Sequence, residues 1–188
     1  MVGRRGVLLG GLGALALARG ARADALDSLS DGLVEVSPPS VPPEFSFQTA
    51  AGARQTLADY RGKGLVLNIW ATWCGPCVAE MPALDHLAAS VAPFGILVLP
   101  ISVDAQGLPA VKQFYETHGI THLPMLVDPG NDVARAFKVE GIPTSFLIDR
   151  GGRIAGHVEG AVQWDSADAI ATIRGLVNVG APPELQYG

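Results

Sequence analysis

Two nearly continuous apolar runs with an amphipathic segment between them form the clearest pattern in the chain. Residues 65–70 read LVLNIW, and residues 95–101 contain a second run of the same kind. Such runs are typical of central strands buried on both faces. Between them, Met81, Leu84, Leu87 and Val91 recur at spacings of three and four, which predicts a helix. Strand, helix and strand of these lengths predict a right-handed parallel crossover unit.

The flanking segments complete a mixed α/β pattern. Periodic apolar positions predict a second helix over residues 108–118, ended by Gly119. Ile170, Ile173 and Val177 predict the apolar face of a last helix, capped by Asp165 or Ser166 and ended before Gly180. Alternating residues predict a small leading hairpin over residues 45–57 and a second hairpin over residues 144–159. The fold class is therefore α/β, with a central mixed β-sheet flanked by helices on both faces and an N-terminal hairpin extension.

Both ends of the chain differ in composition from this domain. Residues 24–43 are rich in proline, which predicts an extended linker, so the domain is expected to cover residues 44–178. Residues 179–188 contain Pro182 and Pro183 and are expected to form a loose tail.

Residues 1–23 have the three-part layout of a secretory signal. Arg4 and Arg5 precede a short apolar run, and an Ala-Arg-Ala triplet ends at Ala23. The run is shorter than the roughly 20 residues that a membrane span needs, so cleavage is expected rather than anchoring. Paired arginines also occur in twin-arginine export signals, and an uncleaved membrane anchor is the alternative. The sequence therefore predicts a periplasmic or otherwise exported protein that is soluble once the signal is removed.

Length and charge limit the other possibilities. A chain of 188 residues with 48% hydrophobic composition can bury one good core, which favours a single domain with appendages. The formal net charge is -5, and paired arginines occur only near the N-terminus, so we expect no nucleic-acid partner.

Both cysteines of the chain lie in the stretch WCGPC, residues 73–77, directly after the first apolar run. As a structural staple, a disulfide between them would close a loop of only about four residues and would constrain the unfolded chain little. As a metal site, the pair would need further ligands, and the four histidines stand at no paired spacing, so no metal is expected. Redox chemistry is the interpretation that spacing and context favour.

The position of the motif predicts how the two sulfurs differ. Cys74 should lie at a helix N-terminus, where unpaired N–H groups and the helix dipole favour the thiolate. Cys77, one turn further on, should be more buried and able to attack a mixed disulfide formed at Cys74. Gly75 and Pro76 suit the tight first turn.

Three stretches resemble the TlpA/ResA-type thiol-disulfide oxidoreductases, an exported group within the thioredoxin superfamily. They are LNIWATWCGPC at residues 67–77, EMP at residues 80–82 and GIPTSFLID at residues 141–149. The resemblance covers residues 44 to about 178 and implies a thioredoxin-like fold. It also implies a cis peptide bond before Pro143, which would face the cysteine pair and leave the backbone of Ile142 free to bind a substrate strand. Trp73, Gly75, Pro76, Ile142 and Pro143 are accordingly the expected substrate-binding residues.

Glu80 is the candidate proton-exchange group. It stands three residues after Cys77, on the same face of the predicted helix, where a carboxylate could take up the thiol proton or raise the pKa of the thiol. Asn68 occupies the place where cytoplasmic thioredoxins carry a buried aspartate, which suggests that proton handling has moved to Glu80. A solvated helix carboxylate is the alternative. Glu140 is expected at the rim of the same groove.

These observations predict a thiol-disulfide oxidoreductase in which Cys74, Cys77 and Glu80 are catalytic and no cofactor beyond the Cys74–Cys77 disulfide is needed. The resemblance implies a reductant that is recharged by a membrane thiol transporter and acts on apocytochrome c or copper-site assembly proteins. A thiol oxidant or isomerase, and a copper metallochaperone using the same two thiols, are the alternatives. A peroxidase is disfavoured because its nucleophile would stand in a different motif.

Overall fold

The computed structural model describes residues 26–178. The expected signal peptide at residues 1–23 and the expected tail at residues 179–188 lie outside the described residues. Within the described part, no helix is long and apolar enough to cross a membrane.

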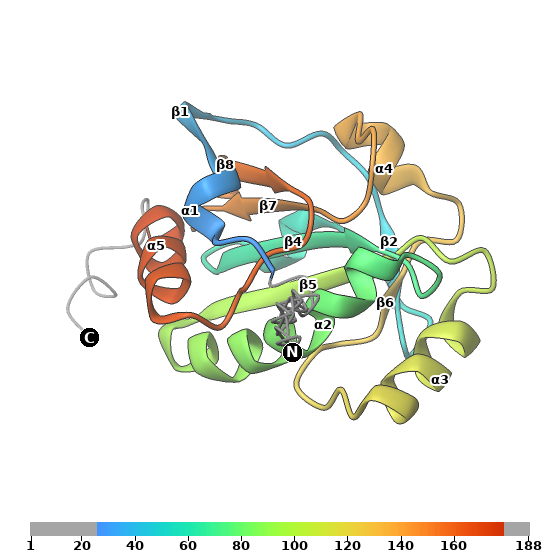
Figure 1. Cartoon of the computed structure of the whole chain (residues 1–188). Helices are drawn as coiled ribbons and strands as arrows, with labels where there is room; N and C mark the ends of the chain where they lie inside the picture. The colour runs from blue at the N-terminus through green and yellow to red at the C-terminus, as the bar shows by residue number, and fades with distance from the viewer. Residues whose placement is uncertain (1–25, 179–188) are drawn as a thin grey trace, which may run out of the picture.

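A mixed sheet of eight strands runs through the centre of the molecule in the order β1-β8-β7-β4-β5-β6-β2-β3 (Figure 1). β4, β5 and β6 are parallel, whereas β7 pairs antiparallel with β4 and β8 pairs antiparallel with β7. The strands are β1 Val34–Ser40, β2 Phe47–Thr49, β3 Arg54–Gln55, β4 Gly64–Trp70, β5 Ile96–Ser102, β6 Leu126–Val127, β7 Thr144–Ile148 and β8 Ile154–Glu159.

Helices cover both faces of this sheet, as predicted. α1, α2, α3 and α5 share one apolar cluster with the sheet, and α4 belongs to the cluster on the opposite face (Figure 1). The helices are α1 Leu29–Gly32, α2 Gly75–Val91, α3 Leu108–His118, α4 Asp132–Phe137 and α5 Ala167–Val177, with short 3-10 turns at Leu57–Tyr60 and Ala92–Phe94. α2 and α3 lie on the same face because both are crossovers between neighbouring parallel strands.

The long elements agree with the sequence analysis. All seven residues of β4 are buried, which explains its unbroken apolar run. Gly119 ends α3 with a left-handed backbone conformation, and the Ser166 side chain caps α5. The leading hairpin is β2–β3 and the second hairpin is β7–β8. The sequence analysis missed β6 and α4, which are too short to produce a recognisable period.

The N-terminal boundary of the folded domain needs correction. Residues 34–40, expected to be part of a linker, form the edge strand β1, which pairs with β8. The register shifts between Glu35 and Ser40, and Pro38 and Pro39 lie in this irregular part. Proline is tolerated there because an edge strand has one side on which no ladder hydrogen bond is made. Residues 29–32, also within the expected linker, form α1, whose Leu29 is buried in the core, and residues 41–46 between β1 and β2 have no regular structure.

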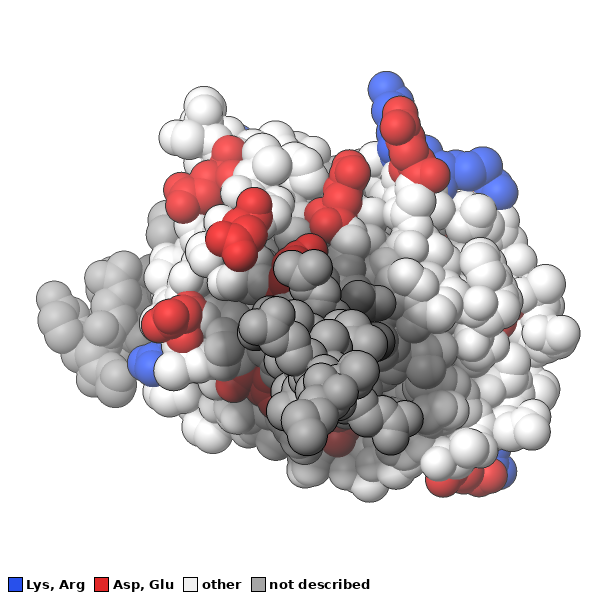
Figure 2. Space-filling model, viewed as in Figure 1, with Lys and Arg blue, Asp and Glu red and all other residues white. Residues whose placement is uncertain are grey.

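Acidic side chains are spread over the face shown in Figure 2, and basic side chains lie at its margins. The coloured part of this face therefore has no basic stripe of the kind that attracts nucleic-acid phosphates.

Candidate active site

The two cysteines lie where buried strand β4 passes into helix α2. Cys74 is the N-cap residue of α2, and Pro76 occupies its first turn. The Sγ atom of Cys74 accepts a hydrogen bond from the backbone N–H of Cys77 at 3.2 Å. The N-terminal position predicted from sequence is therefore confirmed, and the sulfur of Cys74 lies at the positive end of the helix dipole.

Cys74 and Cys77 form a disulfide. Cys74 keeps 6% of its surface exposed, and Cys77 is fully buried. An incoming sulfur can therefore reach Cys74 more readily than Cys77. This difference matches the roles of attacking and resolving cysteine that the sequence analysis assigned to them.

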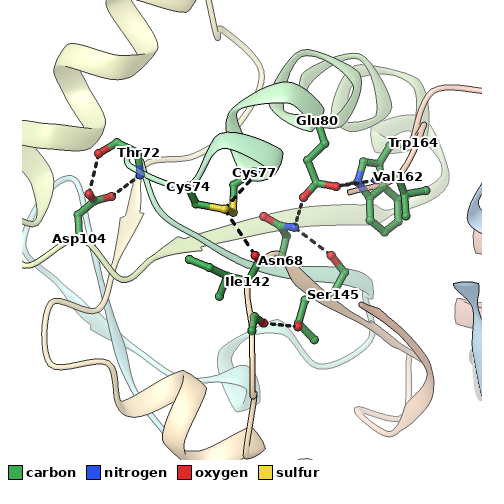
Figure 3. Close-up of a disulfide and its surroundings, with 12 residues drawn as sticks. Asn68, Thr72, Cys74, Cys77, Glu80, Asp104, Ile142, Ser145, Val162 and Trp164 are labelled. Atoms are coloured by element: carbon green, nitrogen blue, oxygen red, sulfur yellow. Dashed lines mark hydrogen bonds between the residues drawn. A yellow bond between two sulfur atoms is a disulfide. The ribbon is translucent and has the colours of Figure 1, made fainter. Parts of the chain in front are cut away.

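The loop before β7 faces this disulfide from the neighbouring strand. The Ile142–Pro143 peptide bond is cis, as the family resemblance implies. The backbone oxygen of Ile142 lies 3.5 Å from Sγ of Cys74 (Figure 3). Pro143 is buried, Ile142 is partly exposed, and Glu140 is exposed just before them. Glu140 itself is exposed next to this loop and, among the described residues, makes no side-chain hydrogen bond or ion pair with the cysteines.

Exposed residues flank the disulfide on the side of the helix. Trp73 has 69% of its surface exposed, the kind of exposure that large apolar side chains show at recognition sites. Gly75 and Pro76 are exposed as well. Together with Ile142, these residues offer an apolar surface beside Cys74.

Glu80 is fully buried, which excludes the alternative of a solvated carboxylate. One carboxylate oxygen accepts a hydrogen bond from Nδ2 of Asn68 at 2.8 Å. The other accepts from the backbone N–H of Val162 at 3.0 Å and from the indole N–H of Trp164 at 2.7 Å. Burial raises the pKa of Glu80 to about 7, although all three hydrogen bonds act in the opposite direction. A carboxyl group with this pKa can gain or lose a proton near neutral pH.

Two of these partners could not be found from the sequence. Val162 and Trp164 belong to the connection between β8 and α5 and carry no local motif. They reach Glu80 only because α2 and α5 pack against each other on the same face of the sheet. Ser145 on β7 is a further missed neighbour, since its Oγ accepts a hydrogen bond from Asn68 at 2.9 Å (Figure 3).

A second buried carboxylate anchors the loop that precedes Cys74. Asp104 accepts hydrogen bonds from the backbone N–H of Thr72 at 2.9 Å and from its hydroxyl at 2.6 Å. Ser102 donates a third, at 2.7 Å. These bonds tie the loop between β4 and α2 to the end of β5, so they fix the approach to Trp73 and Cys74.

Three of the four histidines have a polar partner other than the cysteines, and the fourth, His157, stacks on Phe146. His86 pairs with Asp165 and His122 with Asp85, while the His118 ring contacts the backbone oxygen of Phe114. Within residues 26–178, no three His, Cys, Asp or Glu side chains cluster in a way that could hold a metal ion.

Comparison with known proteins gives a consistent family. Residues 40–157 match the sequence profile of the AhpC/TSA family. The thiol-disulfide oxidoreductase ResA of Geobacillus kaustophilus is 37% identical over 123 residues, which are 65% of this chain and 70% of the relative. The ResA protein of Bacillus anthracis is 34% identical over 118 residues, covering 63% of this chain and 67% of the relative.

Solved structures agree with the fold. A thiol:disulfide interchange protein of the thioredoxin family from Chlorobium tepidum is 31% identical and superimposes with a TM-score of 0.59, covering 73% of this chain and 98% of that one. The exposed lipoprotein thioredoxin of Streptococcus pneumoniae is 28% identical, with a TM-score of 0.59 and coverage of 71% and 99%. The sheet and the helices that hold the Cys74–Cys77 disulfide therefore form a thioredoxin-like fold.

Proposed function

The chain belongs to the AhpC/TSA family and is a thiol-disulfide oxidoreductase of the ResA type, and from this premise we propose that it is exported and reduces disulfide bonds in other exported proteins. One observation carries the mechanism. Helix α2, capped by Cys74 with its 6% exposed surface, also holds the fully buried Cys77 and, one turn further on, a buried carboxylate with a pKa of about 7.

The proposed reaction starts from the reduced protein. The Cys74 thiolate attacks one sulfur of the partner's disulfide, so that a mixed disulfide forms and the partner's second sulfur leaves as a thiolate. Cys77 then loses its proton to Glu80 and attacks Sγ of Cys74. This second exchange closes the Cys74–Cys77 disulfide and releases the partner with two reduced sulfurs. Two electrons have passed from this protein to the partner.

The surface beside the cysteines is proposed to bind the partner. Trp73, Gly75, Pro76 and Ile142 are available for contact with an extended segment around the partner's disulfide. Pro143 is buried behind them and fixes the loop.

Export and the identity of the partners are supported by the sequence pattern alone. The arginine pair, the apolar run and the Ala-Arg-Ala triplet before residue 24 support secretion to the periplasm. The ResA-type resemblance supports apocytochrome c or copper-site assembly proteins as targets. A membrane thiol transporter would have to supply the two electrons that each cycle consumes.

Two measurements on the exported protein test this proposal. Titration of the Cys74/Cys77 couple against a dithiothreitol or glutathione buffer should give a strongly reducing potential. Cys77→Ser should trap partners as mixed disulfides, because the second exchange cannot occur, and Cys74→Ser should trap none. A potential as high as that of a disulfide donor would reverse the proposed direction of electron flow. Trapping that is equal in the two variants would overturn the assignment of Cys74 as the attacking sulfur.

A further inference from the structure

The side-chain amide of Asn68 has an uneven set of hydrogen bonds. Its nitrogen donates twice, to Glu80 at 2.8 Å and to Ser145 at 2.9 Å. Its oxygen has no partner, although the residue is fully buried. In Figure 3 the nitrogen points to Glu80 and Ser145, and the oxygen is directed to the side of the disulfide. A buried acceptor without a donor is costly, so its position beside the cysteines calls for an explanation.

The oxidised state of the cysteines explains why the Asn68 oxygen has no partner. In the disulfide neither sulfur carries a hydrogen, so neither can donate to the Asn68 oxygen. After reduction, the buried Cys77 thiol gains an S–H group on the same side of β4. That S–H group could donate to the Asn68 oxygen, which has no partner in the oxidised protein.

The surroundings of Glu80 impose a complementary requirement. Asn68, Val162 and Trp164 all donate to the carboxylate, and no acceptor faces it among the hydrogen bonds of the described residues. A protonated Glu80 would therefore have an O–H group without a partner. Rotation of the Asn68 amide by about 180° removes this conflict, because the amide oxygen and nitrogen exchange places. The oxygen then accepts from protonated Glu80 and from the Ser145 hydroxyl, and the nitrogen faces the cysteines.

We propose that Asn68 is a positioning residue that couples Glu80 to Cys77 by reversing its amide when the proton moves between them. In the first state Glu80 is charged, and the Cys77 thiol donates to the Asn68 oxygen. The proton then leaves Sγ of Cys77 and binds a carboxylate oxygen of Glu80, so the negative charge passes to the sulfur. In the second state Glu80 donates to the Asn68 oxygen, and the Asn68 nitrogen donates to the Cys77 thiolate. No electrons move in this step.

This inference rests on the proposed function, because it assumes that Glu80 takes the proton of Cys77. Burial alone accounts for the raised pKa of Glu80, against the hydrogen bonds from Asn68, Val162 and Trp164, which lower it, and no other charge contributes. Around the carboxylate, β4 contributes Asn68 and the connection to α5 contributes two N–H groups, none of which titrates. Cys77 stands one turn before Glu80 on the same helix and, once reduced, is the titratable group that the proposal assigns to this exchange.

A double-mutant cycle tests the role of Asn68. Glu80→Gln places an NH₂ donor where protonated Glu80 would have its O–H, so it should hold the Asn68 amide in the reversed orientation. Cys74→Ser leaves Cys77 as the single thiol, and its titration can be followed through the 13Cβ chemical shift of labelled cysteine. In this background, Glu80→Gln should lower the Cys77 pKa by about one unit more with Asn68 in place than with Asn68→Leu, which corresponds to an extra tenfold rise in the thiolate-to-thiol ratio.

Three outcomes of the cycle are distinct. A larger lowering of the Cys77 pKa with Asn68 in place supports the coupling. Ser145→Ala should retain this larger lowering, because it leaves the Asn68 amide between Glu80 and Cys77. If Glu80→Gln lowers the Cys77 pKa equally with Asn68 and with Leu at position 68 (Asn68→Leu), the role of Asn68 is overturned and Glu80 remains the proton acceptor. No effect of Glu80→Gln in either background would overturn both. Reduction of a model disulfide by the unaltered protein tests thiol-disulfide exchange independently of all three.

The amide can also be observed directly if Asn68→Leu fails to fold. The chain contains three asparagines, so 15N-asparagine labelling gives a short set of side-chain NH₂ signals. In the full-length reduced protein, the Asn68 NH₂ signal should shift as Glu80 titrates near pH 7, and in Glu80→Gln it should stay near the low-pH position over this range, because glutamine mimics protonated Glu80. A signal that is the same in both proteins at every pH would overturn the proposal.

Discussion

The indole N–H of Trp164 donates a 2.7 Å hydrogen bond to the carboxylate of Glu80, although the two residues lie 84 positions apart. Both side chains are fully buried. The contact links the connection before α5 to the helix that carries both cysteines. The proton affinity of Glu80 is therefore set partly by a segment outside the region around the CxxC motif.

Trp164→Phe should destabilise the protein more than Trp70→Phe. Both indole rings are fully buried, but the Trp70 N–H has no hydrogen-bond partner, so its loss costs packing alone. The Trp164 substitution also removes the hydrogen bond to charged Glu80. Above pH 7, Trp164→Phe should therefore lower the free energy of unfolding by about 1.5–3 kcal/mol more than Trp70→Phe does. Urea unfolding of the two variants measures it. Equal losses at high pH would contradict the proposed strength of the bond.

The raised pKa of Glu80 makes stability depend on pH in a defined window. The folded protein binds this proton with a pKa of about 7, against an ordinary value of 4.5 for glutamate. The contribution of Glu80 protonation to the free energy of unfolding is therefore complete below about pH 4.5 and is lost as the pH rises through about 7. The total is on the order of 3 kcal/mol at most.

The oxidised protein and its Glu80→Gln variant isolate this effect, because the cysteines do not titrate in the disulfide. The free energy of unfolding of the parent protein should fall relative to that of the variant between about pH 4.5 and 7. Most other titrating groups cancel in the difference. A difference that is constant over this range would mean that the pKa of Glu80 is close to its ordinary value.

The sequence was sufficient for the centre of the fold and for the reactive pair. The buried strand β4, the amphipathic helix α2 and the CxxC motif are local patterns, and each could be recognised within about 20 residues of chain. Pro143 required the family resemblance, because proline in an isolated strand sequence does not indicate a cis bond.

What the sequence could not provide depends on tertiary contacts. Whether Glu80 was buried or solvated could not be decided from its spacing to Cys77, since the partners that bury it come from β4 and from the segment before α5. β1 was missed because its prolines resemble those of a linker until β8 is known to lie beside it. The second buried carboxylate near the site, Asp104, has no sequence motif that indicates its hydrogen bonds to Thr72.

Thr72→Val should loosen the loop that leads to Cys74. The substitution removes the hydroxyl that donates to Asp104 and leaves one oxygen of a fully buried carboxylate without that donor. We expect a loss of about 1–3 kcal/mol in unfolding free energy and slower reaction of reduced Cys74 with model disulfides.

Thr117→Val is the matched control, because the Thr117 hydroxyl donates to the backbone oxygen of Gln113 on an exposed helix surface. It should change stability by less than about 0.5 kcal/mol and leave the rate unchanged. If Thr72→Val and Thr117→Val lower the free energy of unfolding equally, the hydrogen bonds from Thr72 to Asp104 do not anchor the loop.

Trp73→Ala should separate recognition of protein partners from the chemistry of the disulfide. Trp73 is 69% exposed, so its truncation removes little packing and should change stability by less than about 0.5 kcal/mol. Exposed tryptophans often dominate binding, with losses of about 2 kcal/mol or more when truncated, or about 30-fold in affinity. The KM for a disulfide-bonded protein substrate should therefore rise by about this factor, whereas the rate with oxidised glutathione should change little.

Phe94→Ala is the control, because Phe94 is 38% exposed and lies beyond the far end of α2. It should alter neither the KM for the protein substrate nor the rate with oxidised glutathione. A parallel loss of both activities in Trp73→Ala would show that Trp73 supports the reactivity of Cys74 rather than the docking of partners.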